Sequence, residues 1–379
     1  MKKIIAITAM AAAAAVTAVS AVEVNSQLRF NANVLQGGEG KEFGMLKNEE
    51  GSWGLFQLSV EGEKAGAFFN LTSNAEIYNH DRDQGFSFDG FNLWLQPIEQ
   101  LRFDIGGSYW QNAIPYVMGG FSTISGSGVG GPYTVTGGWI QPRGFTTIIK
   151  PIDGLEMRVI LNPGYETWYI QGSDDGVTFG DTHFRLTYGG DFGNIGFAVE
   201  YNGRAGATVD GYAAHADDNW IAFAAGFSKN IDPISFSVAA SADIVGSYFN
   251  HVKGGVDFQY AQDAFAVQVG VPVTYYDGYR ALAADTNGTA ETKDLLDIGA
   301  QVALKYTIND NWTPNISIRV NDFLAFSNSA EAIWFGPGIY GHPVENVTID
   351  ARVKTAIVTT EGAKTPISVD VPVSFYINF

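Results

Sequence analysis

The chain contains no cysteine among its 379 residues. This excludes a disulfide framework and any metal site built on thiolates. Basic residues are also scarce, with 22 Lys and Arg against 40 Asp and Glu and a net charge of −18 at pH 7. Such a balance argues against nucleic acid or an anionic membrane surface as the partner. Beyond the first 21 residues no apolar run approaches the about 18 residues that a transmembrane helix needs.

Glycine and aromatic residues are abundant instead. The chain has 45 Gly, 26 Phe, 17 Tyr and 8 Trp, and only 16% of its residues are charged. Its mean hydropathy is zero, an average that conceals alternation of apolar and polar residues. We find no linker, charge run or change in composition that would divide the chain. The composition predicts a single domain of many strands and turns.

Residues 1–21 have the features of a secretory signal peptide. Lys2 and Lys3 precede an apolar run that ends in the small residues Ala18, Ser20 and Ala21. The alternative, an N-terminal core helix, fits the small residues less well. Cleavage would remove two lysines and no acid, so that residues 22–379 would carry 20 basic and 40 acidic residues. We therefore expect an exported protein.

About 18 segments of the remaining chain alternate apolar and polar residues with a period of two. Gln27 to Leu35 places Leu28, Phe30 and Val34 on one face, and Leu296 to Tyr306 repeats the pattern. Eight short turns follow the even-numbered segments. They are expected near 62–64, 97–100, 151–154, 191–194, 230–233, 262–263, 309–313 and 342–346.

The other connections are long, and most are acidic. They are 36–51, 78–85, 111–142, 163–180, 203–217 and 277–294. Short turns on one side and long loops on the other are typical of a transmembrane barrel.

The C-terminal segment alternates with a strict period of two, with Phe375, Ile377 and Phe379 on its apolar face. It resembles the C-terminal assembly signal of bacterial outer-membrane β-barrel proteins. The resemblance implies an all-β fold, a closed antiparallel transmembrane β-barrel in the outer membrane of a diderm bacterium, surrounded by lipid and inserted by the barrel-assembly machinery. We expect about 18 strands, with 16 as second choice. No plug domain is expected, because the first strand follows the cleavage site closely. Pro372 removes a donor from the last strand and predicts a local bulge.

In a barrel that holds water, the inward side chains decide what passes. One alternative is that these charges only hydrate the lumen and pair with one another. The other is that Arg319, Arg352 and Lys354 form a basic wall whose replacement by Ala would lower anion relative to cation permeability. The candidate pore-lining residues are Arg29, Arg102, Asp104, Glu156, Arg158, Arg185, Asp297, Lys305, Arg319, Asp350, Arg352 and Lys354.

The longest connection, residues 111–142, contains no charged residue. It is similar to the third external loop of general porins, which folds inward and narrows the channel. Phe121, Ile124 and Tyr133 are the candidate constriction residues, although the acidic residues usual in that loop are absent. The alternative is an additional hairpin, which would raise the count to 20 strands. Association into a porin-like homotrimer stays open.

The sequence gives little support to catalysis. Five histidines are scattered, without a serine and an acid at a recognisable spacing. Acidic pairs such as Asp81 with Asp83 do not complete a calcium loop. We expect no enzyme activity, cofactor or metal. Aromatic residues near strand ends, among them Trp94, Tyr275, Tyr306 and Tyr340, are expected in girdles at the membrane interfaces. The alternative for some of them is a sugar-binding track inside the barrel.

These features predict a porin that lets small hydrophilic solutes and ions diffuse passively. An adhesin or structural barrel acting through its external loops would not need an open lumen. A channel for hydrophobic substrates would need an apolar path through the barrel. Both alternatives stay open at the level of the sequence.

Overall fold

The computed structural model describes residues 19–38, 41–48, 53–74, 86–106, 111–112, 139–140, 144–162, 181–202, 220–245, 248–276, 295–320, 333–359, 364 and 366–378. None of these residues is helical, so the described ranges offer no helix able to cross a membrane. The strands are β1 (Val19–Gly38), β2 (Lys41–Asn48), β3 (Trp53–Gly62), β4 (Ala65–Asn74), β5 (Phe86–Ile98), β6 (Leu101–Gly106), β7 (Gln111–Asn112), β8 (Trp139–Ile140), β9 (Gly144–Ile149), β10 (Leu155–Asn162), β11 (Asp181–Gly190), β12 (Gly193–Asn202), β13 (Trp220–Ile231), β14 (Ile234–Val245), β15 (Tyr248–Gln262), β16 (Phe265–Tyr276), β17 (Leu295–Ile298), β18 (Ala300–Tyr306), β19 (Trp312–Val320), β20 (Ile333–Val344), β21 (Val347–Arg352), β22 (Lys354–Ile357) and β23 (Ile367–Asn378).

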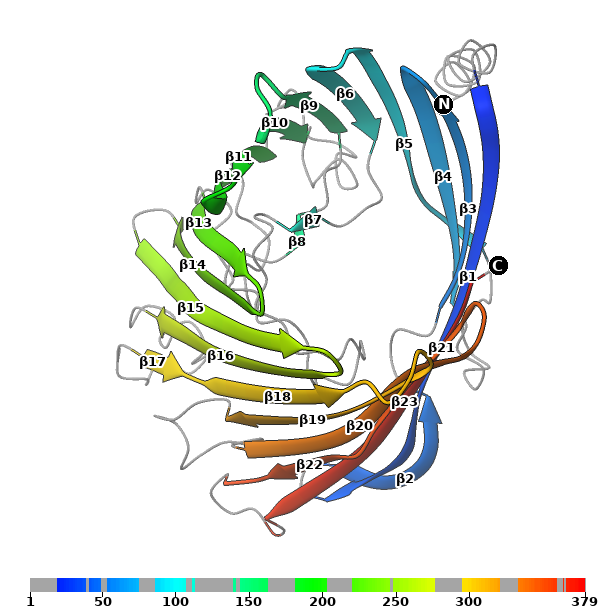
Figure 1. Ribbon diagram of the computed structural model, residues 1–379, viewed down its shortest axis with the longest axis vertical. Coiled ribbons are helices and arrows are strands. Elements are labelled where there is room, and N and C mark those ends of the chain that lie inside the picture. The colour runs from blue at the N-terminus through cyan, green and yellow to red at the C-terminus, as the bar shows by residue number, and fades with distance from the viewer. Residues whose placement is uncertain are drawn as a thin grey trace, which may run out of the picture.

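One antiparallel sheet of 21 of these segments closes on itself (Figure 1). Three strands of the barrel are interrupted and count as two segments each. β2 and β3 both pair with β1, and β17 and β18 both pair with β16. β21 and β22 both pair with β20 on one side and with β23 on the other. The result is an 18-stranded barrel, closed where β23 pairs with β1. The predicted fold and strand number are confirmed, and the 16- and 20-stranded alternatives are wrong.

All eight short turns lie where the sequence predicts them. Each joins neighbouring antiparallel strands, from the turn between β3 and β4 to the turn at Glu345–Asn346 between β20 and β21. The backbone N–H of Asn378 donates to the carbonyl of Asn346 at 2.9 Å. The C-terminal end of β23 therefore lies at the rim that carries the short turns.

The first part of the chain differs from the expectation in two places. β1 begins at Val19 rather than at Gln27, because Val22 and Val24 continue its alternation and pair with Val60 and Leu58 of β3. The predicted loop 36–51 contains a strand, β2, which extends the ladder along β1. Residues 1–18 of the predicted signal peptide lie outside the described residues, and its cleavage stays a prediction.

Each barrel strand has two different faces. Along β18 the side chains of Val302 and Leu304 are each 37% exposed, while the alternate residues Gln301 and Ala303 are 4% and 1% exposed. Exposed apolar residues recur on the same face of the other strands, for example Val256 and Phe258 of β15. In a closed barrel this face is the outer one, and the alternate residues form the inner wall. The predicted alternation of strand residues is therefore confirmed.

The bulge expected at Pro372 occurs at the closing pair of strands. The register between β1 and β23 shifts between Asn33 and Gln36, directly where Asn33 lies opposite Pro372. Two residues of β1 there face one residue of β23, which places the extra residue on the partner strand and not on the proline-containing one.

Candidate functional site

The inner wall between β6 and β11 carries a row of arginines. Arg102 lies opposite Ile148 of β9, Ile148 opposite Arg158 of β10, and Arg158 opposite Arg185 of β11. Side chains directly opposite on antiparallel strands lie on the same face about 5 Å apart at Cβ. The pairing therefore brings three cations that are far apart in the sequence to one level of the wall.

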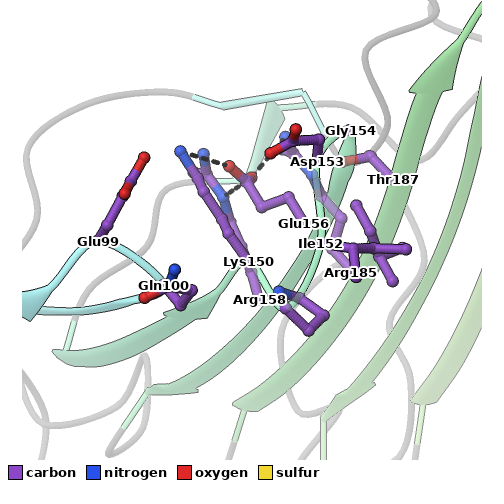
Figure 2. A pocket seen from close by; sticks show the side chains of 12 residues that line it. Glu99, Gln100, Lys150, Ile152, Asp153, Gly154, Glu156, Arg158, Arg185 and Thr187 are labelled. Carbon is purple, nitrogen blue, oxygen red and sulfur yellow. Dashed lines mark hydrogen bonds and ion pairs between the residues drawn. The ribbon is translucent and has the colours of Figure 1, made fainter.

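Glu156 lies two residues nearer the short turn than Arg158, close to Arg158, Arg185 and Lys150 (Figure 2). Its Oε1 accepts a hydrogen bond from Arg158 Nε at 2.5 Å and lies 3.8 Å from Arg185 Nη2, while its Oε2 lies 3.6 Å from Lys150 Nζ. The side chains of Glu156, Arg158 and Arg185 are only 19%, 18% and 15% exposed. Three cations thus face one carboxylate, and two of them, Arg158 and Arg185, are poorly hydrated.

Arg102 is held by different partners at the other end of the row. Its Nη2 lies 2.8 Å from Asp104 Oδ1, and its guanidinium stacks over Trp94 with 4.7 Å between Cζ and the ring centroid. Asp104 also accepts a hydrogen bond of 3.1 Å from Asn92 Nδ2. These contacts combine a paired charge with a cation–π contact, which fixes the guanidinium against the wall.

Trp94 faces inward, so its expected place in an outer girdle is wrong. Its neighbour Leu95 is 51% exposed on the outer face, and the phase of the alternation turns Trp94 to the other side. Tyr340 follows Ile339, which is exposed on the outer face of β20, so Tyr340 also lies on the inner face. Tyr275 and Tyr306, at 38% and 54% exposed, do lie on the outer face. The phase of each strand could have separated these two groups from the sequence alone.

A second group of charges lies on the wall formed by β19 to β23. Arg352 donates to Ser317 Oγ at 3.2 Å, to the Gly336 carbonyl at 3.1 Å and to Asn315 Oδ1 at 2.7 Å, and it is 1% exposed. Lys354 lies opposite Asp370 of β23, with its Nζ 6.0 Å from the Trp334 ring. Arg319, Arg352 and Lys354 therefore share one wall, but two of the three cations are buried in it together with Asp350 and Asp370.

The structure places ten of the twelve candidate pore-lining residues on the inner face of the described strands. Only the backbones of Arg29 in β1 and Asp297 in β17 are described, not their side chains. Lys150, Trp94 and Asp370 were missed as inner-wall residues. Lys150 was missed because it was assigned to a strand end, yet its alternation with Ile149 would have placed it inward. The ten residues are Arg102, Asp104, Glu156, Arg158, Arg185, Lys305, Arg319, Asp350, Arg352 and Lys354.

The long connection after β6 begins and ends in a short ribbon of its own. Gln111 and Asn112 of β7 pair with Ile140 and Trp139 of β8 in a sheet separate from the barrel. Figure 1 shows this ribbon within the outline of the ring of strands. Phe121, Ile124 and Tyr133 lie outside the described residues, as does Phe379, while Phe375 is exposed on the outer face of β23.

Comparison with known proteins found no matching family model and no matching curated protein. Solved structures match over almost the whole chain. OccK3 (OpdO) of Pseudomonas aeruginosa has a TM-score of 0.55 at 11% identity, covering 96% of each chain. The outer-membrane protein OpdK of the same organism has 0.53 at 9% identity, covering 95% of this chain and 99% of its own. OmpF of Salmonella typhi, solved with daunomycin, has 0.52 at 10% identity, covering 94% and 97%. The chain thus has the fold of the bacterial outer-membrane porins.

Proposed function

We propose that the protein is an outer-membrane channel through which small hydrophilic solutes and ions diffuse passively. The observation that carries this proposal is the opposite chemistry of the two faces of the closed barrel. Large apolar side chains cover the outside, and charged and polar side chains line the inside. An apolar belt of this kind is costly in water and favourable against lipid hydrocarbon, whereas a charged interior holds water.

The outer membrane of a diderm bacterium is the location we infer, reached by way of the signal peptide in residues 1–21. The apolar residues on the outer face of β23 include Phe375 and Ile377. Together with Phe379 they support recognition by the barrel-assembly machinery. The mass of the protein purified from outer membranes of an expressing host tests both parts of this inference. A mass that matches residues 22–379 supports export with cleavage after Ala21, and the mass of the uncleaved chain contradicts it.

Permeation in this proposal depends on the size and the field of the lumen. The described wall between β6 and β11 holds four cations, Lys150, Arg102, Arg158 and Arg185, against the two carboxylates Asp104 and Glu156. A surplus of positive charge in a narrow passage raises the local concentration of anions. The connection 111–142 would narrow the cross-section if it extends inward from the β7–β8 ribbon, and we propose this role for it.

The test is the conductance of the refolded, signal-free protein in a planar lipid bilayer under a salt gradient. Stable open steps with a defined reversal potential are expected. The control is the same protein without refolding, which inserts no closed barrel. A barrel that is folded, as shown by its altered migration on heating, but gives no conductance would overturn the channel proposal and favour an adhesive or structural role.

A further inference from the structure

A recess opens on the inner wall at the rim of the short turns. It has a volume of about 520 Å³ and lies between the turn at Glu99–Gln100 and the turn that ends at Gly154. The side chains of Lys150, Glu156, Arg158 and Arg185 line it, and Thr187 lies opposite Glu156 on β11. The charged groups described above are therefore accessible from a hollow large enough for a small solute.

The four central groups of the recess carry a formal charge of +2. They are Lys150, Glu156, Arg158 and Arg185. Glu156 accepts a hydrogen bond from Arg158 Nε, while its distances to Lys150 Nζ and Arg185 Nη2 of 3.6 and 3.8 Å exceed hydrogen-bond length. Two further acids of the recess, Glu99 and Asp153, lie exposed on the turns, where water and salt screen them. Figure 2 shows Glu99 apart from the cluster, on the facing turn. The field within the recess is consequently dominated by the less hydrated cations.

We propose that this recess is a weak binding subsite for small oxyanions, phosphate or carboxylate, and that Glu156 is a built-in competing anion that keeps their affinity low. Lys150 and Arg185 approach the Glu156 carboxylate from two sides, which is the arrangement that an incoming oxyanion requires. Guanidinium and ammonium groups are the usual partners of such ligands. The subsite deepens the proposed channel function, on which its role in transport rests.

The competing carboxylate has a physical reason in a conducting pore. Passage requires binding strong enough for the solute to enter and weak enough for it to leave. Three cations without Glu156 would carry +3 and hold an oxyanion longer. Glu156→Gln keeps the shape of the side chain and an oxygen for the Arg158 Nε–H, and it removes only the negative charge.

The experiment measures binding and conductance in the same variants. Line broadening of the ³¹P signal of inorganic phosphate reports binding to the refolded protein in detergent, and a parallel titration with acetate distinguishes carboxylate from phosphate as the preferred oxyanion. We expect Glu156→Gln to bind phosphate about three- to tenfold more tightly than the unaltered protein, from the loss of one like charge at close range. Lys150→Gln should weaken binding by a smaller factor, because the Lys150 side chain is 56% exposed and its charge is screened as well.

Glu63→Gln is the matched control, because Glu63 is an exposed acid on the turn between β3 and β4 and does not line the recess. It should bind phosphate like the unaltered protein. Equal tightening in both Gln variants, or no oxyanion binding in Glu156→Gln, would overturn the subsite even if the channel conducts. Binding with the expected order of variants in a barrel that does not conduct would support the subsite and reject the channel, so the two proposals fail separately.

Discussion

Asn33 Oδ1 accepts a hydrogen bond of 2.9 Å from the backbone N–H of Val371, across the two strands that close the barrel. The contact occurs where β1 and β23 lose register and where Pro372 supplies no N–H of its own. Asn33 is 2% exposed and also donates to Asp370 Oδ1 at 3.4 Å. The Asn33 side chain thus replaces part of the backbone hydrogen bonding between the first and the last strand, where the barrel closes.

Asn33→Ala should destabilise the barrel by about 1–3 kcal/mol, because it leaves the partly buried Val371 N–H without its acceptor. Urea unfolding in lipid vesicles, followed by tryptophan fluorescence, measures the change. Asn378→Ala is the control on the same pair of strands, since Asn378 bonds to Gln27 in an exposed position. It should alter stability by less than about 0.5 kcal/mol. Equal losses in the two variants would show that the bulge does not depend on Asn33.

Gly66 provides the space in which Trp94 lies flat on the inner wall. A Cβ at this position would come within 2.4 Å of Trp94 Nε1. Gly66→Ala should therefore displace the indole from Arg102, cost about 1–3 kcal/mol and shift the tryptophan emission. Gly254→Ala is the matched change, because its Cβ would meet nothing closer than the Ala239 carbonyl at 3.7 Å. An Ala at Gly66 that leaves both stability and emission unchanged would contradict the packing described here.

The closed barrel was predictable because alternation and turn spacing are local properties of the sequence. A glycine and an acid in each of the stretches Gly62 to Lys64 and Pro151 to Gly154 indicate turns without reference to the rest of the chain. The partners across strands were not predictable, because register depends on the whole sheet. The row formed by Arg102, Arg158 and Arg185 and the three hydrogen bonds that bury Arg352 depend on the register in which consecutive strands pair, and the alternation within one strand does not fix that register.

The β7–β8 ribbon allows the predicted constriction to be removed without opening the barrel. Because Gln111 and Asn112 already pair with Ile140 and Trp139, replacing residues 113–138 by a short Gly/Asn turn leaves both ends of the connection in place. We expect a larger single-channel conductance and faster liposome swelling with larger sugars, since the passage loses its narrowing segment. Replacing the 18-residue connection 277–294 by the same short turn is the control. Equal conductance in both deletions would show that residues 113–138 do not narrow the lumen.

Burial decides how the charges of β19 to β23 act on passing ions. The guanidinium of Arg352 is bound by Ser317, Gly336 and Asn315, so Arg352→Ala should cost stability, about 3 kcal/mol for a buried charged group whose partners are left behind. Replacing all three cations by Ala would mix this loss with any effect on selectivity. Glutamine at Arg319 and Lys354 limits the loss of stability, because Arg319 is half-buried and glutamine at the buried Lys354 keeps a hydrogen-bond donor opposite Asp370.

Arg319→Gln with Lys354→Gln removes two positive charges from this wall and keeps polar side chains in place. The change turns the net charge of this group from positive to negative. The group consists of Arg319, Arg352, Lys354, Asp350 and Asp370. If the wall acts on the lumen, the reversal potential in a salt gradient should therefore shift toward cation selectivity. Lys64→Gln removes a charge from an exposed turn and should leave the potential almost unchanged at 0.15 M salt, where screening is strong beyond about 8 Å. An unchanged potential in a stable double variant would confine ion selection to the wall between β6 and β11, where the cations are less deeply buried and outnumber the acids two to one.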